Sequence, residues 1–184
     1  MIKRGLFVAL LSVATVLSAS AGKFKPSPVF LKGEKQINVV FDYSQVKFDG
    51  DSKEKQYKDK GKKWVEEWEG KRRDNNAEIF TSKMNEELKN VSVGEYPNAK
   101  YTIIVVVVDC DFGAYAGPMS VPAKLKGTIK IVKTGTKEVL ASIDMKVKQN
   151  SFTVIGTPVD FDRMYLAFDQ LGQETGKKLA KALK

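Results

Sequence analysis

The segment from Lys100 to Asp111 constrains the fold most, because its centre, Ile103 to Val108, consists entirely of β-branched residues. Such residues favour extended strands, and this run has no polar side. A strand without a polar side must be covered on both faces of its sheet. The sequence therefore predicts a central strand here, ending where Asp109, Cys110 and Asp111 follow one another.

Alternating apolar and polar residues predict three further strands. Gln36 to Tyr43 forms the first, which Val46 and Phe48 extend past a kink. The other two flank a glycine turn at Lys133 to Lys137 and pair as an antiparallel hairpin. The outer side of this hairpin is a basic sheet face made of Lys124, Lys126, Lys130, Lys146 and Lys148.

Two helices are expected between the first strand and the central strand. Tyr57, Trp64 and Trp68 recur at helical spacing, although Trp64 and Trp68 also fit the alternation of a strand. The second helix has an apolar stripe of Ala77, Phe80, Met84, Leu88 and Val91. The region therefore predicts two amphipathic helices that cover one face of the sheet.

A long C-terminal helix starts at Thr157, which is followed by a proline as is typical of a first helical turn. Gly172 and Gly176 lie four residues apart in this helix, and we expect them to allow close packing on the sheet. Together these patterns predict a single α+β domain of order β-α-α-β-β-β-α. Its mainly antiparallel four-stranded sheet packs against the C-terminal helix and the middle helical region.

The amino terminus has the pattern of a secretory signal peptide over residues 1–21. Lys3 and Arg4 precede an apolar run, and Ala19-Ser20-Ala21 matches a cleavage site. The run is shorter than the about 20 residues of a membrane-spanning helix. We expect a periplasmic or secreted protein with an extended leader (22–35) and one domain (36–184), the alternative being an uncleaved anchor. No cysteine follows the cleavage site for lipid attachment.

The residue types present argue against most catalytic chemistry. The chain has no histidine, which excludes a Ser-His-Asp triad, a Cys-His pair and the usual zinc sites. Cys110 is its one cysteine, so no internal disulfide forms, and an inert buried thiol is favoured over a reactive one. We expect no enzyme activity, no catalytic residue, no metal site and no cofactor.

Three features are candidates for ligand binding. Trp64 and Trp68 would form a platform for sugar rings, although their spacing more often indicates burial. Asp109 and Asp111 share one side of a strand end and would hold Ca²⁺ or act as acid and base, although acids commonly mark a strand's exit into water. Tyr115 lies in a glycine-rich loop that would contact a partner or serve only as a crossover.

The formal net charge of +9 would attract anionic polysaccharides, lipid headgroups or nucleic acid. Lysine greatly outnumbers arginine, however, and phosphate and base recognition favour arginine. Nucleic acid is therefore disfavoured as a partner, and an anionic surface remains an alternative for the basic sheet face.

Tyr101 to Cys110, followed by the hairpin sequence Thr128 to Ala141, resembles small bacterial envelope domains. These include uncharacterised secreted families and the periplasmic part of curli-secretion-type lipoproteins. The resemblance implies a βαβββα layered domain. The resemblance does not imply that this chain forms a secretion pore, because the chain lacks the anchoring cysteine and the long pore-forming insertions of the curli-secretion-type proteins.

The leading hypothesis is a non-enzymatic envelope module that binds or assembles through a sheet face or edge. Its partner would be an envelope protein, a polysaccharide or a second copy of the chain, which would help to cover Ile103 to Val108. The alternative is a secreted carbohydrate-active enzyme or sugar-binding accessory protein that uses Asp109, Asp111 and the tryptophans.

Overall fold

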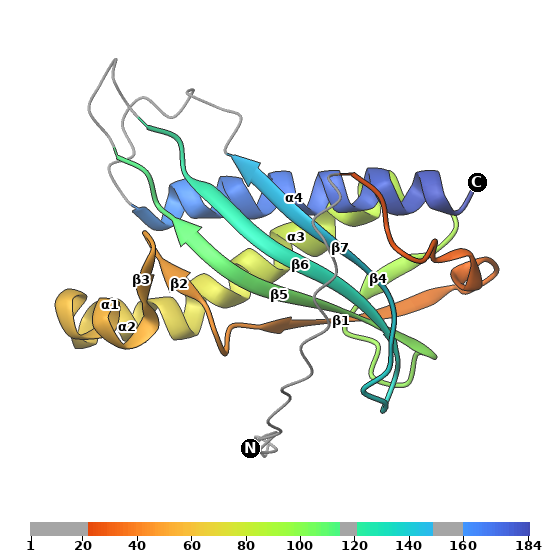
Figure 1. Ribbon diagram of the computed structural model, residues 1–184, viewed down its shortest axis with the longest axis horizontal. Helices are drawn as coiled ribbons and strands as arrows, with labels where there is room; N and C mark the ends of the chain where they lie inside the picture. The colour runs from red at the N-terminus through yellow and green to blue at the C-terminus, as the bar shows by residue number, and fades with distance from the viewer. Residues whose placement is uncertain (1–21, 115–120, 149–159) are drawn as a thin grey trace.

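The computed structural model describes residues 22–114, 121–148 and 160–184 (Figure 1). The strands are β1 (Gln36–Asp42), β2 (Lys47–Phe48), β3 (Asp51–Ser52), β4 (Ser92–Gly94), β5 (Tyr101–Asp111), β6 (Lys124–Lys133) and β7 (Val139–Lys148). The helical elements are the 3₁₀ turn η1 (Val29–Leu31), α1 (Lys53–Lys60), α2 (Lys62–Glu67), the π-helical segment η2 (Trp68–Arg72), α3 (Arg73–Glu87) and α4 (Asp160–Ala182). The predicted signal peptide, Tyr115 and Thr157 lie outside the described residues.

The predicted α+β class and the central position of β5 are confirmed. In the described part of the chain, the sheet has seven strands rather than the predicted four, because β3 and β4 are too short to show alternation and β2 is separate from β1. β5 pairs with β1 in parallel and with β6 antiparallel, and β6 pairs antiparallel with β7. The pair β1–β5 is parallel because the helical region between them carries the chain back to the end at which β1 began. The short β2 continues along the same side of β5, where Lys47 is opposite Asp109, so the predicted kinked extension of the first strand is confirmed.

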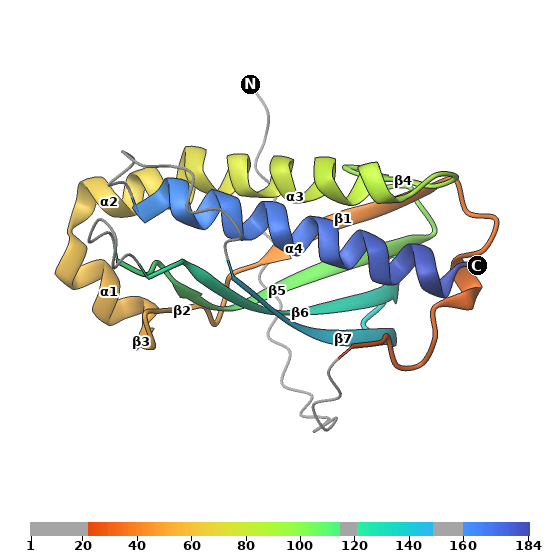
Figure 2. The same cartoon turned by 90° about the horizontal axis from the view of Figure 1, so that it is seen from above.

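Both long helices lie on the same face of the sheet (Figure 2). α4 approaches α3 closely at Gly172, where an added Cβ would lie 2.3 Å from the Phe80 carbonyl oxygen. An added Cβ at Gly176 would lie 2.8 Å from the Met84 carbonyl oxygen. The prediction that these glycines pack on the sheet is therefore wrong, because they face the neighbouring helix and allow the two helix backbones to meet.

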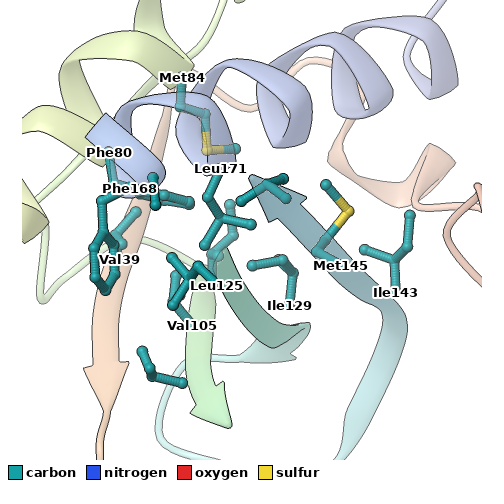
Figure 3. Close-up of a cluster of buried hydrophobic side chains, with 14 of the residues drawn as sticks. Val39, Phe80, Met84, Val105, Leu125, Ile129, Ile143, Met145, Phe168 and Leu171 are labelled. Atoms are coloured by element: carbon teal, nitrogen blue, oxygen red, sulfur yellow. The ribbon is translucent and has the colours of Figure 1, made fainter. Parts of the chain in front are cut away.

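The core fills the space between this helix pair and the sheet (Figure 3). Phe80 and Met84 of α3 and Phe168 and Leu171 of α4 are fully buried against the inner side of the strands. The strands contribute Val39, Val105, Leu125, Ile129, Ile143 and Met145. Their burial confirms the inward side that the alternation predicts for the hairpin.

The other side of β5 departs from the prediction. Ile103, Val105 and Val107 point inward and are at most 1% exposed, whereas Val108 is 41% exposed. Ile104 and Val106 are half-buried, and α3 and α4 lie on one face of the sheet only (Figure 2). The expectation that this run is covered on both faces is thus wrong within the described residues, because the helices that the sequence predicts all pack on one side. We call the opposite side the outer face.

The leader from residue 22 onward packs against the domain. Phe24 and Leu31 are buried, and the backbone of Lys25 exchanges two hydrogen bonds with that of Ser142 in β7 (2.9 and 3.0 Å). Part of the edge of β7 is therefore paired. Within the described ranges, no helix is both long enough and apolar enough to cross a membrane.

Candidate functional site

The five lysines of the predicted basic face lie together on the outer face of β6 and β7. The register places Lys124 opposite Lys148 and Lys126 opposite Lys146, while Lys130 is opposite Ser142. Side chains directly opposite on neighbouring strands have Cβ atoms about 5 Å apart, and like charges there repel. We call Lys124, Lys126, Lys130, Lys146 and Lys148 the lysine grid.

Asp109 and Asp111 border the lysine grid from β5. The Lys126 ammonium donates to Asp109 Oδ2 (2.7 Å), and the Lys124 ammonium donates to Asp111 Oδ2 (3.0 Å). A bulge after Val107 brings Asp109 opposite Lys126 and keeps it on the outer face. The two carboxylates therefore neutralise Lys124 and Lys126 but not Lys130, the third lysine of the grid on β6.

The environment of Asp111 stabilises its charged form. Partial burial raises the pKa of this carboxyl, but hydrogen bonds from the Lys124 ammonium and the Gly113 amide outweigh burial, so its pKa lies below the ordinary value. An acid of this kind is poorly suited to donate a proton. Among the described residues, no group of three or more potential metal-ligating side chains is present.

Three lysines of the grid, two on β7 and one on β6, keep a positive charge that no described residue pairs. Lys146 and Lys148 are exposed and form no ion pair with any described residue, and the same holds for half-buried Lys130. Lys47 of β2 lies opposite Asp109 of β5, and Asp109 lies opposite Lys126 of β6. Lys47 therefore extends the row that Lys126 forms with Lys146 of β7. Sequence reasoning missed Lys47, because a strand of two residues has no pattern that shows which way its side chains point.

A hollow of about 650 Å³ adjoins the grid. On the outer face it is lined by Val108, Lys126, Thr128, Asp144 and Lys146. Glu174 and Lys178 line it from α4. The hollow therefore holds the ammonium groups of Lys126, Lys146 and Lys178 and the carboxylates of Asp144 and Glu174 beside an apolar wall.

Trp64 and Trp68 lie away from the grid, in an aromatic cluster at the end of the helical region. Trp68 is 0% exposed and Trp64 is half-buried, and their rings stack with centroids 6.0 Å apart. Both rings pack against Phe48, Phe112 and Phe161. The face of Trp68 is thus inaccessible to a sugar, and the helical spacing reflects burial.

Cys110 should not react with thiol reagents in the folded protein. Burial raises the pKa of its thiol well above the ordinary value, and the Asp109 and Asp49 carboxylates raise it further. We expect negligible reaction of Cys110 with Ellman's reagent at neutral pH, measured by absorbance, and complete reaction in guanidinium chloride. Rapid reaction without denaturant would show that Cys110 is accessible.

No known protein family and no curated protein matches this chain. Among solved structures, the PelC dodecamer from Paraburkholderia phytofirmans is 10% identical, with a TM-score of 0.42, over 77% of this chain and 88% of that one. A DUF330 protein from Xanthomonas campestris is 16% identical, with a TM-score of 0.35, over 56% of this chain and 57% of that one. At these TM-scores neither likeness assigns a function to this chain, and the resemblance to curli-secretion-type lipoproteins stays a prediction.

Proposed function

We propose that this protein is a non-catalytic binding module whose outer sheet face binds an acidic polysaccharide. The observation that carries the proposal is the register of β6 and β7, which places two pairs of lysines directly opposite each other. Only the β6 member of each pair has a carboxylate partner. A bound anion would relieve the repulsion between the opposed lysines. The predicted signal peptide would place this binding in the cell envelope.

The spacing of the lysine grid suits a polymer. Neighbouring strands lie about 4.8 Å apart, and alternate residues of one strand lie about 7 Å apart. Lys124, Lys126, Lys146 and Lys148 therefore form a two-by-two array of ammonium groups, which Thr128 and Asp144 separate from Lys130. A chain with repeated acidic groups contacts this array at several points. Several weak contacts along one chain add up to useful affinity.

Two other anionic partners fit this face less well. Nucleic acid recognition favours arginine, and the described arginines lie elsewhere. Arg72 and Arg73 stack on Phe161 and Trp68 of the aromatic cluster, and the buried Arg163 donates to the Phe112 carbonyl oxygen. Proteins that lie on membranes usually insert tryptophan or phenylalanine beside their lysines. The lysine grid has only Val108 as an exposed large apolar neighbour on β5.

The alternative of a carbohydrate-active enzyme receives less support. Asp109 and Asp111 are each in contact with a lysine ammonium, at 2.7 and 3.0 Å. A general acid for glycoside hydrolysis needs a raised pKa, whereas the pKa of Asp111 is lowered. Trp68, which would stack on the sugar ring in this alternative, is buried in a different part of the fold.

A double substitution in the grid tests the proposal. We expect Lys146→Glu with Lys148→Glu to weaken binding to polygalacturonate about tenfold or more, because two attractive contacts become repulsive. Binding is measured by isothermal titration calorimetry at low ionic strength, with neutral dextran as the control polymer. Added salt should weaken the wild-type interaction, since Lys126, Lys146 and Lys148 are exposed.

The matched control is Lys133→Glu with Lys137→Glu. It makes the same change in net charge at the opposite end of the same hairpin, where both lysines are exposed. Its affinity for polygalacturonate should stay within about twofold of the wild type if the site is local. Equal losses in the two double variants would show that net charge alone governs binding and would contradict the proposal.

A further inference from the structure

The edge of the sheet at β1 is only partly paired. β4 runs beside β1 over Gln36–Asn38 alone, and the chain then leaves the edge. The departure is fixed by the side chain of Asn38, whose Oδ1 accepts a hydrogen bond from the Tyr96 amide (3.0 Å). From Val39 to Asp42, β1 has a strand partner on its β5 side only, within the described residues.

A cleft of about 830 Å³ follows this unpaired edge. Val39, Val40 and Phe41 form one wall, and α3 forms the other through residues that include Ala77 and Thr81. Val40 is 41% exposed, which is unusual for a valine on a strand. Exposed strand edges are normally blocked by short strands, charges or a covering loop, whereas here the groove continues the line of β4.

The cleft is acidic although the chain is basic. Asp74 and Glu78 project from α3, and Glu95 projects from the loop after β4. All three are exposed, and none forms an ion pair with a described residue. The described residues that line the cleft include no lysine or arginine, although the whole chain has a net charge of +9. The local charge therefore favours a basic occupant.

We propose that this cleft, the β1 cleft, binds an extended segment of a partner protein that carries lysine or arginine side chains. The segment adds a strand to β1 beyond the end of β4, and its basic side chains contact Asp74, Glu78 and Glu95. Backbone groups on a strand edge are satisfied by another backbone, which favours a polypeptide over a sugar. This site is separate from the lysine grid and does not depend on the proposed polysaccharide binding.

A labelled peptide tests the β1 cleft. We use a short peptide of alternating lysine and valine, and two comparison peptides in which glutamate replaces lysine or proline replaces each valine. Fluorescence anisotropy should show saturable binding of the first peptide, and at least about tenfold weaker binding of the other two. The glutamate peptide tests charge complementarity, and the proline peptide tests backbone pairing.

Two variants locate the binding. Asp74→Asn with Glu78→Gln should weaken binding of the lysine peptide about tenfold. The control Glu54→Gln with Asp59→Asn makes the same change in net charge on exposed residues of α1 and should leave binding unchanged. Ser82→Trp, at an exposed position that lines the cleft, should block entry without removing any charge.

Amide hydrogen exchange supplies the decisive readout. The peptide should slow the exchange of amides between Val39 and Asp42, because strand addition protects the unpaired edge. Equal binding of the proline peptide, or binding without this protection, would show attraction by charge alone and overturn the proposal. Self-association through β1 that the peptide does not displace would also overturn it, in favour of a second copy.

Discussion

Replacing Trp68 with alanine should lower the free energy of unfolding by about 3–5 kcal/mol. Trp68 is 0% exposed and is the largest of the fully buried side chains. Its ring meets Phe48 edge-on, with centroids 5.1 Å apart and an interplanar angle of 87°, and stacks on Phe161 at 6.0 Å. Truncation would leave a cavity that the surrounding rings, held by α2, β2 and α4, cannot fill. Equilibrium unfolding in guanidinium chloride, followed by circular dichroism, measures the loss.

Trp68→Phe is the matched control for this truncation. The indole Nε1 of Trp68 is buried without a hydrogen-bond partner, so phenylalanine keeps an aromatic ring and removes an unsatisfied donor. We expect Trp68→Phe to cost about 1.5 kcal/mol or less. If Trp68→Ala cost no more than Trp68→Phe, the aromatic cluster would contribute little to stability, and Trp68 would be free to serve as a ligand platform.

Replacing Gly172 with alanine should also destabilise the protein strongly, by about 3 kcal/mol. Alanine is favoured over glycine inside a helix by about 1 kcal/mol, so helix propensity alone predicts the opposite sign. The added Cβ would lie 2.3 Å from the carbonyl oxygen and 2.9 Å from the carbonyl carbon of Phe80. Both are backbone atoms, so relief requires α3 and α4 to move apart. The same unfolding experiment measures the change.

Gly176→Ala provides the comparison one turn further along α4. Its added Cβ would lie 2.8 Å from the Met84 carbonyl oxygen, a milder clash than at Gly172. We therefore expect a smaller loss than for Gly172→Ala. A stabilising effect at Gly172 would mean that the two helices are not in backbone contact and that the arrangement of the helix layer is wrong.

The fold was largely predictable because its long strands have clear patterns. The alternation in β6 and β7 identifies the inward residues, and Ile129 and Ile143 are buried as expected. The outer side of β5 was predicted wrongly, since the β-branched run of Ile103 to Val108 does not show whether helices lie on one face or on two. That arrangement depends on how the helices meet, and Gly172 allows α4 to contact the backbone of α3.

The candidate site was predictable in part. The alternation places the lysine grid on one face, but the partners of Lys124 and Lys126 depend on the pairing of β5 with β6 and on a bulge after Val107. No pattern in the sequence specifies that bulge. The unpaired edge at Val40 was equally hidden, because it results from β4 ending at Gly94 after a short pairing with β1.

The central claim is that the lysine grid binds an acidic polysaccharide, and an NMR footprint tests it most directly. Amide and lysine side-chain signals are recorded during titration with polygalacturonate, and again with neutral dextran. We predict that polygalacturonate shifts signals of Lys126, Lys146 and Lys148, while signals of α3 and of the aromatic cluster stay unchanged and dextran has no effect. Shifts centred on Trp64 and the aromatic cluster, or no saturable shift on β6 and β7, would contradict the claim.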